Sequence, residues 1–130
     1  MSKYIEAIGR RKTATARVRL TEASKSSFSV NDKAVDEYFP TKEMQVVARE
    51  ALDKSGIKAE FLITVRVSGS GIHSQAEAVR HGLARVLVLR DADMRSSLKK
   101  IGFLKRDPRA KERKHFGLKK ARKAPTWSKR

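Results

Sequence analysis

The clearest pattern in the chain is an alternation of apolar and polar residues that leads into a helical repeat. From residue 61 to 68 every second side chain is apolar, as in a strand with one buried face. Gly69-Ser70-Gly71 then permits positive φ and a tight reversal. Ser74 and Glu77 have capping-box spacing, which predicts a helix start near residue 74. The expected core positions are Phe61, Ile63, Val65 and Val67 on the strand and Ala76, Val79, Leu83, Val86 and Leu87 on the helix, whereas Glu77, His81 and Arg85 are expected to point away from the core.

The first half of the chain shows the same two periods. Tyr4 to Ile8 forms a plausible strand, and Gly9-Arg10-Arg11-Lys12 is expected to interrupt it with a turn. The strand that follows carries Ala14, Ala16, Val18 and Leu20 on one face and Arg17 and Arg19 on the solvent face. A short strand is predicted around Phe28 and Val30, and it ends at Asn31-Asp32. A helix is predicted from Pro40-Thr41, with one apolar face formed by Met44, Val47, Ala48, Ala51 and Leu52. A basic helical segment is predicted over residues 93–101. This order predicts an α+β fold with its helices on one side of a small sheet.

Charge narrows the possible partners. The 130 residues contain 31 Lys and Arg against 14 Asp and Glu, a net charge of +17, and such an excess favours a polyanion such as nucleic acid. An anionic membrane surface is the rival interpretation, but no apolar run approaches the length of a membrane span. No secretory signal is expected, since no uninterrupted apolar stretch follows the first residues. The absence of cysteine excludes disulfides and thiolate zinc sites and fits a reducing cytoplasm.

The charge is also unevenly distributed along the chain. Residues 99–130 hold 14 Lys and Arg but only two acids, a net charge of +12, whereas the first 98 residues carry only +5. After Gly102 only five large apolar side chains occur, too few to form a core of their own: Phe103, Leu104, Phe116, Leu118 and Trp127. Trp127 could stack on a base or be a stray aromatic. We therefore predict a globular domain over residues 1–101 and an extended basic C-terminal tail over residues 102–130.

Motifs for catalysis or cofactor binding are weak. Gly69-Ser70-Gly71 resembles the start of a dinucleotide fingerprint, but Ser74 stands where the third glycine belongs, and a simple tight turn is the better interpretation. His73 and His81 are eight residues apart, which is not the helical spacing of a metal pair. No nucleophile and base stand at a recognisable spacing. We expect no catalytic site, metal, cofactor or small-molecule substrate.

Cations cluster near the N-terminus. Residues 10–19 contain Arg10, Arg11, Lys12, Arg17 and Arg19 and no acid. Solubility alone does not need so many cations beside a tail of the same sign. Arginine and lysine along one strand can follow a phosphate backbone, so phosphate contact is the better explanation.

Four blocks of residues resemble the bacterial small-subunit ribosomal protein S-nine family along almost the whole chain. They are Ala7-Ile8-Gly9-Arg10-Arg11-Lys12 with Ala16-Arg17-Val18; Gly69-Ser70-Gly71-Ile72-His73-Ser74-Gln75-Ala76; Arg80-His81-Gly82-Leu83-Ala84-Arg85; and the C-terminal Asp107-Pro108-Arg109, Glu112-Arg113-Lys114, Gly117-Leu118-Lys119-Lys120-Ala121-Arg122, Ala124-Pro125 and Ser128-Lys129-Arg130. Ser70 stands where the family usually has the middle glycine of a triplet.

The resemblance implies a fold and partners that the patterns do not supply. It implies a four-stranded sheet with two main helices, like the second domain of ribosomal protein S-five, with a left-handed βαβ crossover. It also implies a cytoplasmic, non-enzymatic protein of the small ribosomal subunit that binds 16S rRNA in the head, near other head proteins. Its C-terminal tail would contact the anticodon stem-loop of P-site tRNA through Ser128, Lys129 and Arg130. The expected rRNA-binding residues are Arg10, Arg11, Lys12, Arg17, Arg19, Gly69, Gly71, Gln75, Arg80, His81, Arg85, Arg109, Arg113, Lys114, Lys119, Lys120, Arg122 and Lys123.

Two functions of other classes are weighed against this one. A free nucleoid-type DNA binder would share the basic charge, and it would compact DNA without associating with ribosomes. A nucleotide-handling enzyme would bind nucleotide stoichiometrically, and changing Gly69 and Gly71 would abolish that binding.

Overall fold

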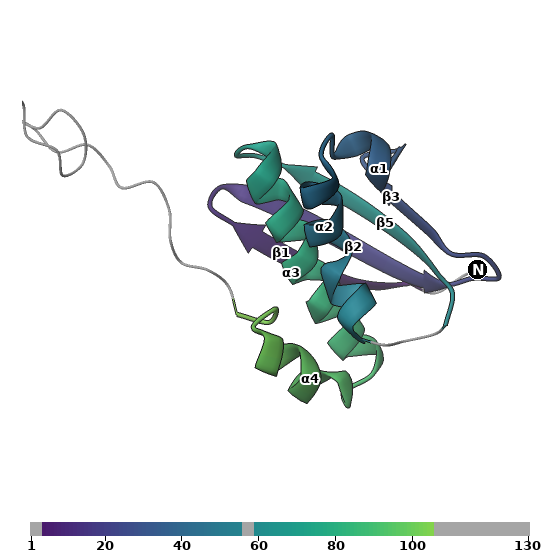
Figure 1. Cartoon of the computed structure of the whole chain (residues 1–130). Coiled ribbons are helices and arrows are strands. Elements are labelled where there is room, and N and C mark those ends of the chain that lie inside the picture. The colour runs from purple at the N-terminus through teal and green to yellow at the C-terminus, as the bar shows by residue number, and fades with distance from the viewer. Residues whose placement is uncertain (1–3, 56–58, 106–130) are drawn as a thin grey trace, which may run out of the picture.

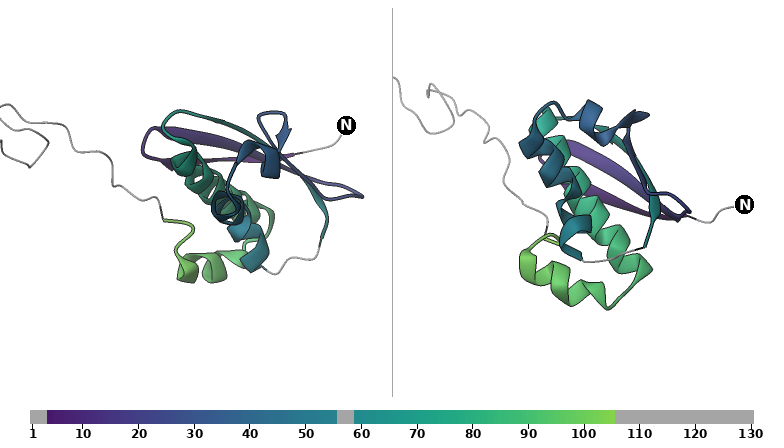
Figure 2. Two further views of the ribbon diagram at one scale, coloured as in Figure 1. Left: turned by 45° about the horizontal axis from the view of Figure 1, so that its top comes forward. Right: turned by 45° about the vertical axis from the view of Figure 1, so that its right-hand side comes forward.

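A mixed sheet with helices on one side makes up the fold in the computed structural model, which describes residues 4–55 and 59–105. The strands are β1 (Ile5–Arg11), β2 (Ala14–Glu22), β3 (Ser27–Val30), β4 (Lys33–Ala34) and β5 (Phe61–Ser68). The helices are α1 (Val35–Tyr38), α2 (Lys42–Ser55), α3 (Ile72–Arg90) and α4 (Met94–Ile101). Helices α2 and α3 cover the same side of the sheet, as predicted (Figures 1 and 2).

The strand order is β1-β2-β5-β3-β4. β1, β2 and β5 pair antiparallel, whereas β3 pairs parallel with β5. A parallel pair needs a crossover, and the chain makes it through β4, α1 and α2. The handedness of this crossover stays a prediction. The predicted count of four strands is wrong because Asn31 and Asp32 both adopt positive φ, as in a two-residue hairpin turn, and fold β4 back onto β3.

The predicted alternation of buried and exposed positions is confirmed on the two longest strands. The apolar residues of β2 and β5 that were assigned to the core are all buried, and Val65 pairs with Val18 on one side and Val30 on the other. The opposite side of the sheet, which carries Arg17 and Arg66, is called the open face below. The core therefore lies between the sheet and α3.

Helix α3 is the centre of the fold. Its five predicted core residues are all buried, and it contacts β1, β2 and α2. The predicted face of α2 also packs inward, with Ala48 and Ala51 buried. The basic helical segment predicted over residues 93–101 is confirmed as α4, which ends at Gly102 in the left-handed conformation.

Phe103 differs from the expectation, because it is only 7% exposed and belongs to the hydrophobic core. Its ring lies under the Arg80 guanidinium, 4.9 Å from the carbon of that group. Sequence periodicity gave no sign of this contact, since the apolar pattern ends at Gly102. The division of the chain into residues 1–101 and 102–130 stays a prediction.

The first hairpin also corrects the sequence interpretation. Gly9, Arg10 and Arg11 were expected in a turn, but they continue β1, and the turn is Lys12-Thr13. Gly9 lies against α3, and a Cβ built on it would be 2.0 Å from the Ala78 carbonyl oxygen and 2.2 Å from the Gly82 nitrogen. The glycine therefore serves a close approach of strand and helix rather than a turn.

Candidate nucleic-acid interface

The hairpin β1–β2 holds the N-terminal cations, but it directs them to different places. Arg10 is exposed on β1, and Lys12 is exposed in the turn with a φ of 53°. Arg11 is on the helix side of β1, where its Nε donates a 2.5 Å hydrogen bond to Oε2 of Glu77 on α3. Its side chain is only 13% exposed. Arg11 therefore braces β1 against α3, a role that sequence spacing does not reveal.

Arg17 and Arg19 lie on the open face and share one carboxylate. Their Nε atoms lie 3.1 Å and 3.0 Å from the two oxygens of Glu6 on β1. The Arg19 guanidinium also stacks over the Tyr4 ring at 4.6 Å. Two guanidinium groups on one carboxylate leave an excess positive charge, and both side chains remain at least partly exposed.

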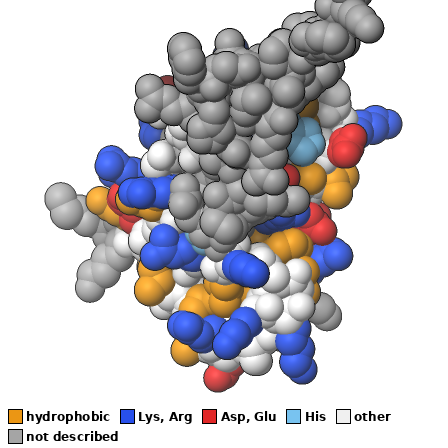
Figure 3. All heavy atoms as spheres, turned by 90° about the vertical axis from the view of Figure 1, so that its left-hand side faces the viewer, with side chains coloured by type: hydrophobic (Ala, Val, Ile, Leu, Met, Phe, Trp, Pro, Cys, Tyr) orange, Lys and Arg blue, Asp and Glu red, His pale blue; other side chains and the backbone are white. Residues whose placement is uncertain are grey.

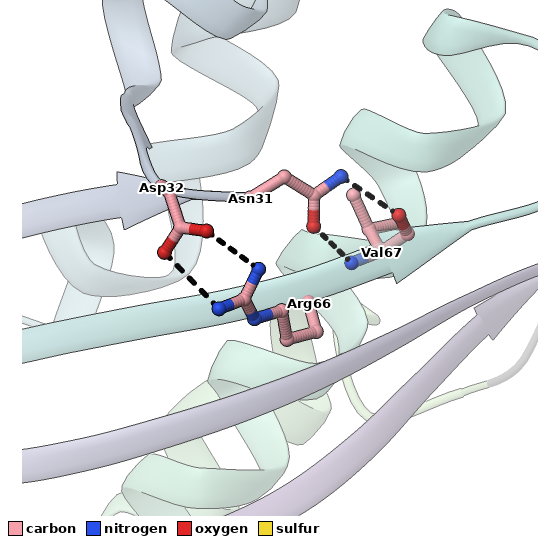
Figure 4. Close-up of polar contacts among 4 residues, drawn as sticks. All are labelled: Asn31, Asp32, Arg66 and Val67. Atoms are coloured by element: carbon pink, nitrogen blue, oxygen red, sulfur yellow. Dashed lines mark hydrogen bonds and ion pairs between the residues drawn. The ribbon is translucent and has the colours of Figure 1, made fainter.

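A second cluster on the open face, which the sequence interpretation missed, joins the β3–β4 turn to β5 (Figure 4). Arg66 makes two hydrogen bonds, of 2.8 Å and 3.1 Å, to the carboxylate of Asp32. The Asn31 side chain donates to the Val67 carbonyl and accepts from the Val67 N–H, both at 2.9 Å. Asn31 thereby replaces a strand neighbour that β5 lacks at this point. The turn could be read from the sequence, but its partners depend on the parallel pairing of β3 with β5.

The loop before α3 is fixed by Gln75. Its Nε2 donates to the Gly69 carbonyl at 3.0 Å, and its Oε1 accepts from the Tyr38 hydroxyl. Gly69 has a φ of 87°, and a Cβ there would be 2.4 Å from the Thr13 carbonyl oxygen. Ser70 has a φ of 54°, in the region that favours glycine, whereas Gly71 has a φ of −88° and open space around it. The predicted need for positive φ thus applies to Gly69 and Ser70.

The predicted capping box is wrong. Helix α3 begins at Ile72 with Gly71 as its N-cap and without a side-chain capping bond. Ser74 is buried inside the first turn, and the Glu77 carboxylate binds Arg11 instead of reaching back to the backbone. The ion pair between helix and strand thus replaces the local contact that the spacing suggested.

The polar side of α3 is turned toward the outer edge of β1. Arg85 Nη1 donates to the Ile8 carbonyl at 2.6 Å, and the Arg10 N–H donates to Nδ1 of His81 at 3.1 Å. Glu77, His81 and Arg85 therefore leave the core as predicted, yet they contact β1. Arg80 instead binds Glu50 of α2 at 3.0 Å and covers Phe103. These polar side chains of α3 therefore contact neighbouring elements, and Arg85 remains exposed among them.

The outer surface retains an excess of positive charge. Figure 3 shows Lys and Arg side chains spread over one side of the molecule among apolar and uncharged atoms, with fewer Asp and Glu. The remaining predicted contacts lie outside the described residues: Arg109, Arg113, Lys114, Lys119, Lys120, Arg122, Lys123, Ser128, Lys129 and Arg130. Trp127, whose role the sequence left open, also lies outside them.

Neither a metal site nor a membrane span appears in the described part of the chain. Residues 4–55 and 59–105 contain no group of three or more His, Asp or Glu side chains that could hold a metal ion. None of the helices in these ranges is both long and apolar enough to cross a bilayer.

The fold and the surface define a small, strongly basic α+β protein whose arginines brace a sheet and face outward from it. The family model for ribosomal protein S9/S16 matches residues 9–130, and the chain belongs to this family. The resemblance carried by the four sequence blocks is thereby confirmed. Members are structural, RNA-binding components of the small ribosomal subunit that act in translation and are not enzymes.

Proposed function

We propose that this protein binds 16S rRNA in the head of the small subunit, beside other head proteins in the cytoplasmic ribosome, and contacts P-site tRNA with its C-terminal tail. We also infer the ribosomal S-five-like fold with a left-handed crossover. The observation that carries the proposal is the division of charge in a chain whose family match extends to residue 130. A protein with +12 in its last 32 residues is suited to neutralising crowded phosphates.

Each part of the chain has its own role in this proposal. Arg10, Lys12, Arg17 and Arg19 supply phosphate contacts from the hairpin β1–β2, where their side chains reach solvent. Arg11, Gln75 and Arg80 support the surface from behind through contacts with Glu77, Gly69 and Glu50. The tail supplies most of the electrostatic attraction, and its terminal Ser128-Lys129-Arg130 reaches tRNA.

Truncation of the tail tests the rRNA function. A protein ending at Lys105 keeps Phe103 in the core but lacks 11 Lys and Arg. It should bind deproteinised 16S rRNA more weakly, and log Kd should depend less steeply on log salt, by roughly 0.7–0.9 for each phosphate that the protein no longer neutralises. Filter binding between about 50 and 200 mM salt measures the slope. An unchanged slope in a folded truncated protein would contradict the role of the tail.

The same titration with duplex DNA of similar length separates this proposal from a nucleoid-type DNA binder. Preference for 16S rRNA at every salt concentration is expected. Equal binding of both nucleic acids, together with DNA compaction and no sedimentation with ribosomal subunits, would favour the DNA binder.

Deleting Ser128, Lys129 and Arg130 tests the tRNA contact. Assembly should be nearly unaffected, because 12 of the 14 cations in residues 99–130 remain. P-site tRNA should dissociate about three- to tenfold faster, since charge-assisted contacts to phosphate contribute about 1.5–3 kcal/mol each and less when screened. The tRNA off-rate from purified subunits at matched protein occupancy is the measurement. Equal off-rates at low and moderate salt would leave only the rRNA role.

A further inference from the structure

A hollow of about 660 Å³ lies along the outer edge of β1, between this strand and α3. Its polar lining consists of Glu6, Arg10, His81 and Arg85, and Leu104 contributes from the segment after α4. This hollow is called the edge groove below. It exists because Gly9 lets α3 approach β1 closely enough for His81 and Arg85 to reach the strand edge.

The arginines of the edge groove differ from the others in their partners. Seven of the ten arginines in residues 4–55 and 59–105 form ion pairs with carboxylates: Arg11, Arg17, Arg19, Arg49, Arg66, Arg80 and Arg90. Within these ranges Arg10, Arg85 and Arg95 have no carboxylate partner, and two of these three line the edge groove. Most other arginines are paired with carboxylates of the protein itself. Two guanidinium groups without such a partner on one hollow therefore indicate an anion-binding site more strongly than the density of cations does.

The backbone of β1 makes contacts with α3 at both arginines of the edge groove. Arg85 gives one N–H to the Ile8 carbonyl, which fixes its guanidinium at the strand edge, and a guanidinium has five N–H donors in all. The backbone N–H of Arg10 donates to His81, which fixes the strand at Arg10, and Arg10 also lines the groove. The carboxylate of Glu6 would repel an anion, but Arg17 and Arg19 already compensate its charge.

We propose that the edge groove binds one backbone phosphate of the RNA, with Arg10 and Arg85 as its two ligands. The inference rests on the proposed rRNA function and adds a defined contact to it. A phosphodiester fits because both arginines offer only donors and because guanidinium groups match the oxygens of phosphate. A carboxylate of this chain is the competing occupant of the groove.

Arg10→Gln in the full-length protein tests the site, because the Arg10 side chain has no ion pair within the described ranges and its removal should leave the fold intact. With deproteinised 16S rRNA as the probe, the affinity should fall about three- to tenfold near 100 mM salt. The salt slope should decrease by roughly 0.7–0.9, as for one phosphate contact. The matched control is Arg95→Gln, which removes the third of these arginines from the exposed surface of α4 and should change the affinity less than twofold.

Coupling between the two ligands provides the second measurement. Arg85→Gln should also weaken binding, and the double variant should be weakened by less than the product of the single effects if both arginines hold one phosphate. In one outcome the wild-type protein binds rRNA, and Arg10→Gln and Arg85→Gln bind it as well as Arg95→Gln does. That result would overturn the phosphate site in the edge groove but not the proposed rRNA function. A lower melting temperature of Arg10→Gln would indicate a carboxylate of the chain in the groove and would also overturn it. Failure of the wild-type protein to bind rRNA would overturn the proposed function together with this site.

Discussion

Gly9→Ala is expected to be the most destabilising of the conservative substitutions in this protein. The added Cβ would lie 2.0 Å from the Ala78 carbonyl oxygen, 2.2 Å from the Gly82 nitrogen and 2.7 Å from the Gly82 Cα. These are backbone atoms in the middle of α3, so no side-chain rotation can relieve the overlap. Relief requires α3 to move away from β1, although that helix also packs on β2 and α2.

The expected cost is at least about 3 kcal/mol, the upper end of typical overpacking, because a whole helix must shift. An ordinary domain has a total stability of about 5–15 kcal/mol, so the substitution should remove roughly a fifth to more than half of it and lower the urea midpoint markedly. Urea unfolding followed by circular dichroism measures the change in the free energy of unfolding.

Gly71→Ala is the matched control. Gly71 has a φ of −88°, and a Cβ there would meet no atom within 4 Å. Its substitution should cost about 1 kcal/mol or less, the scale of a changed helix N-cap. A Gly9→Ala protein as stable as Gly71→Ala would show that α3 does not approach β1 as closely as the structure indicates.

Val65→Asp is expected to prevent stable folding. Val65 is 2% exposed in the middle of β5, and its neighbours Val18 and Val30 are fully buried. A carboxylate here would be in the core without a cationic partner. Burial of an unpaired charge costs several kcal/mol, or the group must take up a proton. The variant should therefore lack a cooperative thermal transition at neutral pH.

Thr64→Asp is the matched control one residue away. Thr64 lies on the open face and pairs in register with Arg19, so the new carboxylate would be in solvent near a cation. Its cost should be about 1 kcal/mol, the range of strand propensities. Similar melting temperatures for the two variants would mean that the register of β5 is wrong by one residue.

Strand and helix periods were readable from the sequence because side-chain direction follows from the local backbone. In β5 every second residue points the same way, so the apolar pattern alone identified the buried face. The same reasoning gave the core side of α3 and the existence of α2 and α4.

Local sequence patterns gave the wrong structure at Gly9 and Ser74. Gly9 resembled a turn residue, yet its position is explained by contact with a helix about 70 residues later. Ser74 and Glu77 had the right spacing for a cap, but Arg11 bound the glutamate.

At the candidate interface, too, the sequence did not predict contacts between segments that are remote in the chain. The sequence identified the cations and their uneven distribution, and the family blocks identified what kind of protein carries them. It could not identify which arginines are neutralised. The partners Glu6 and Arg19, Asp32 and Arg66, and Glu50 and Arg80 come together only when strands pair and helices pack.

The sequence by itself therefore determined the longer elements, their buried faces, the basic character of the chain and its family. Each of these follows from local geometry, residue type or similarity of residues in order. Tertiary structure decided that Gly9 continues a strand, that Phe103 joins the core, and that Arg10 and Arg85 share one groove without a carboxylate partner among the described residues. These outcomes depend on distances between segments that are remote in the chain, and a guanidinium stays available to a phosphate only when folding brings no carboxylate to it.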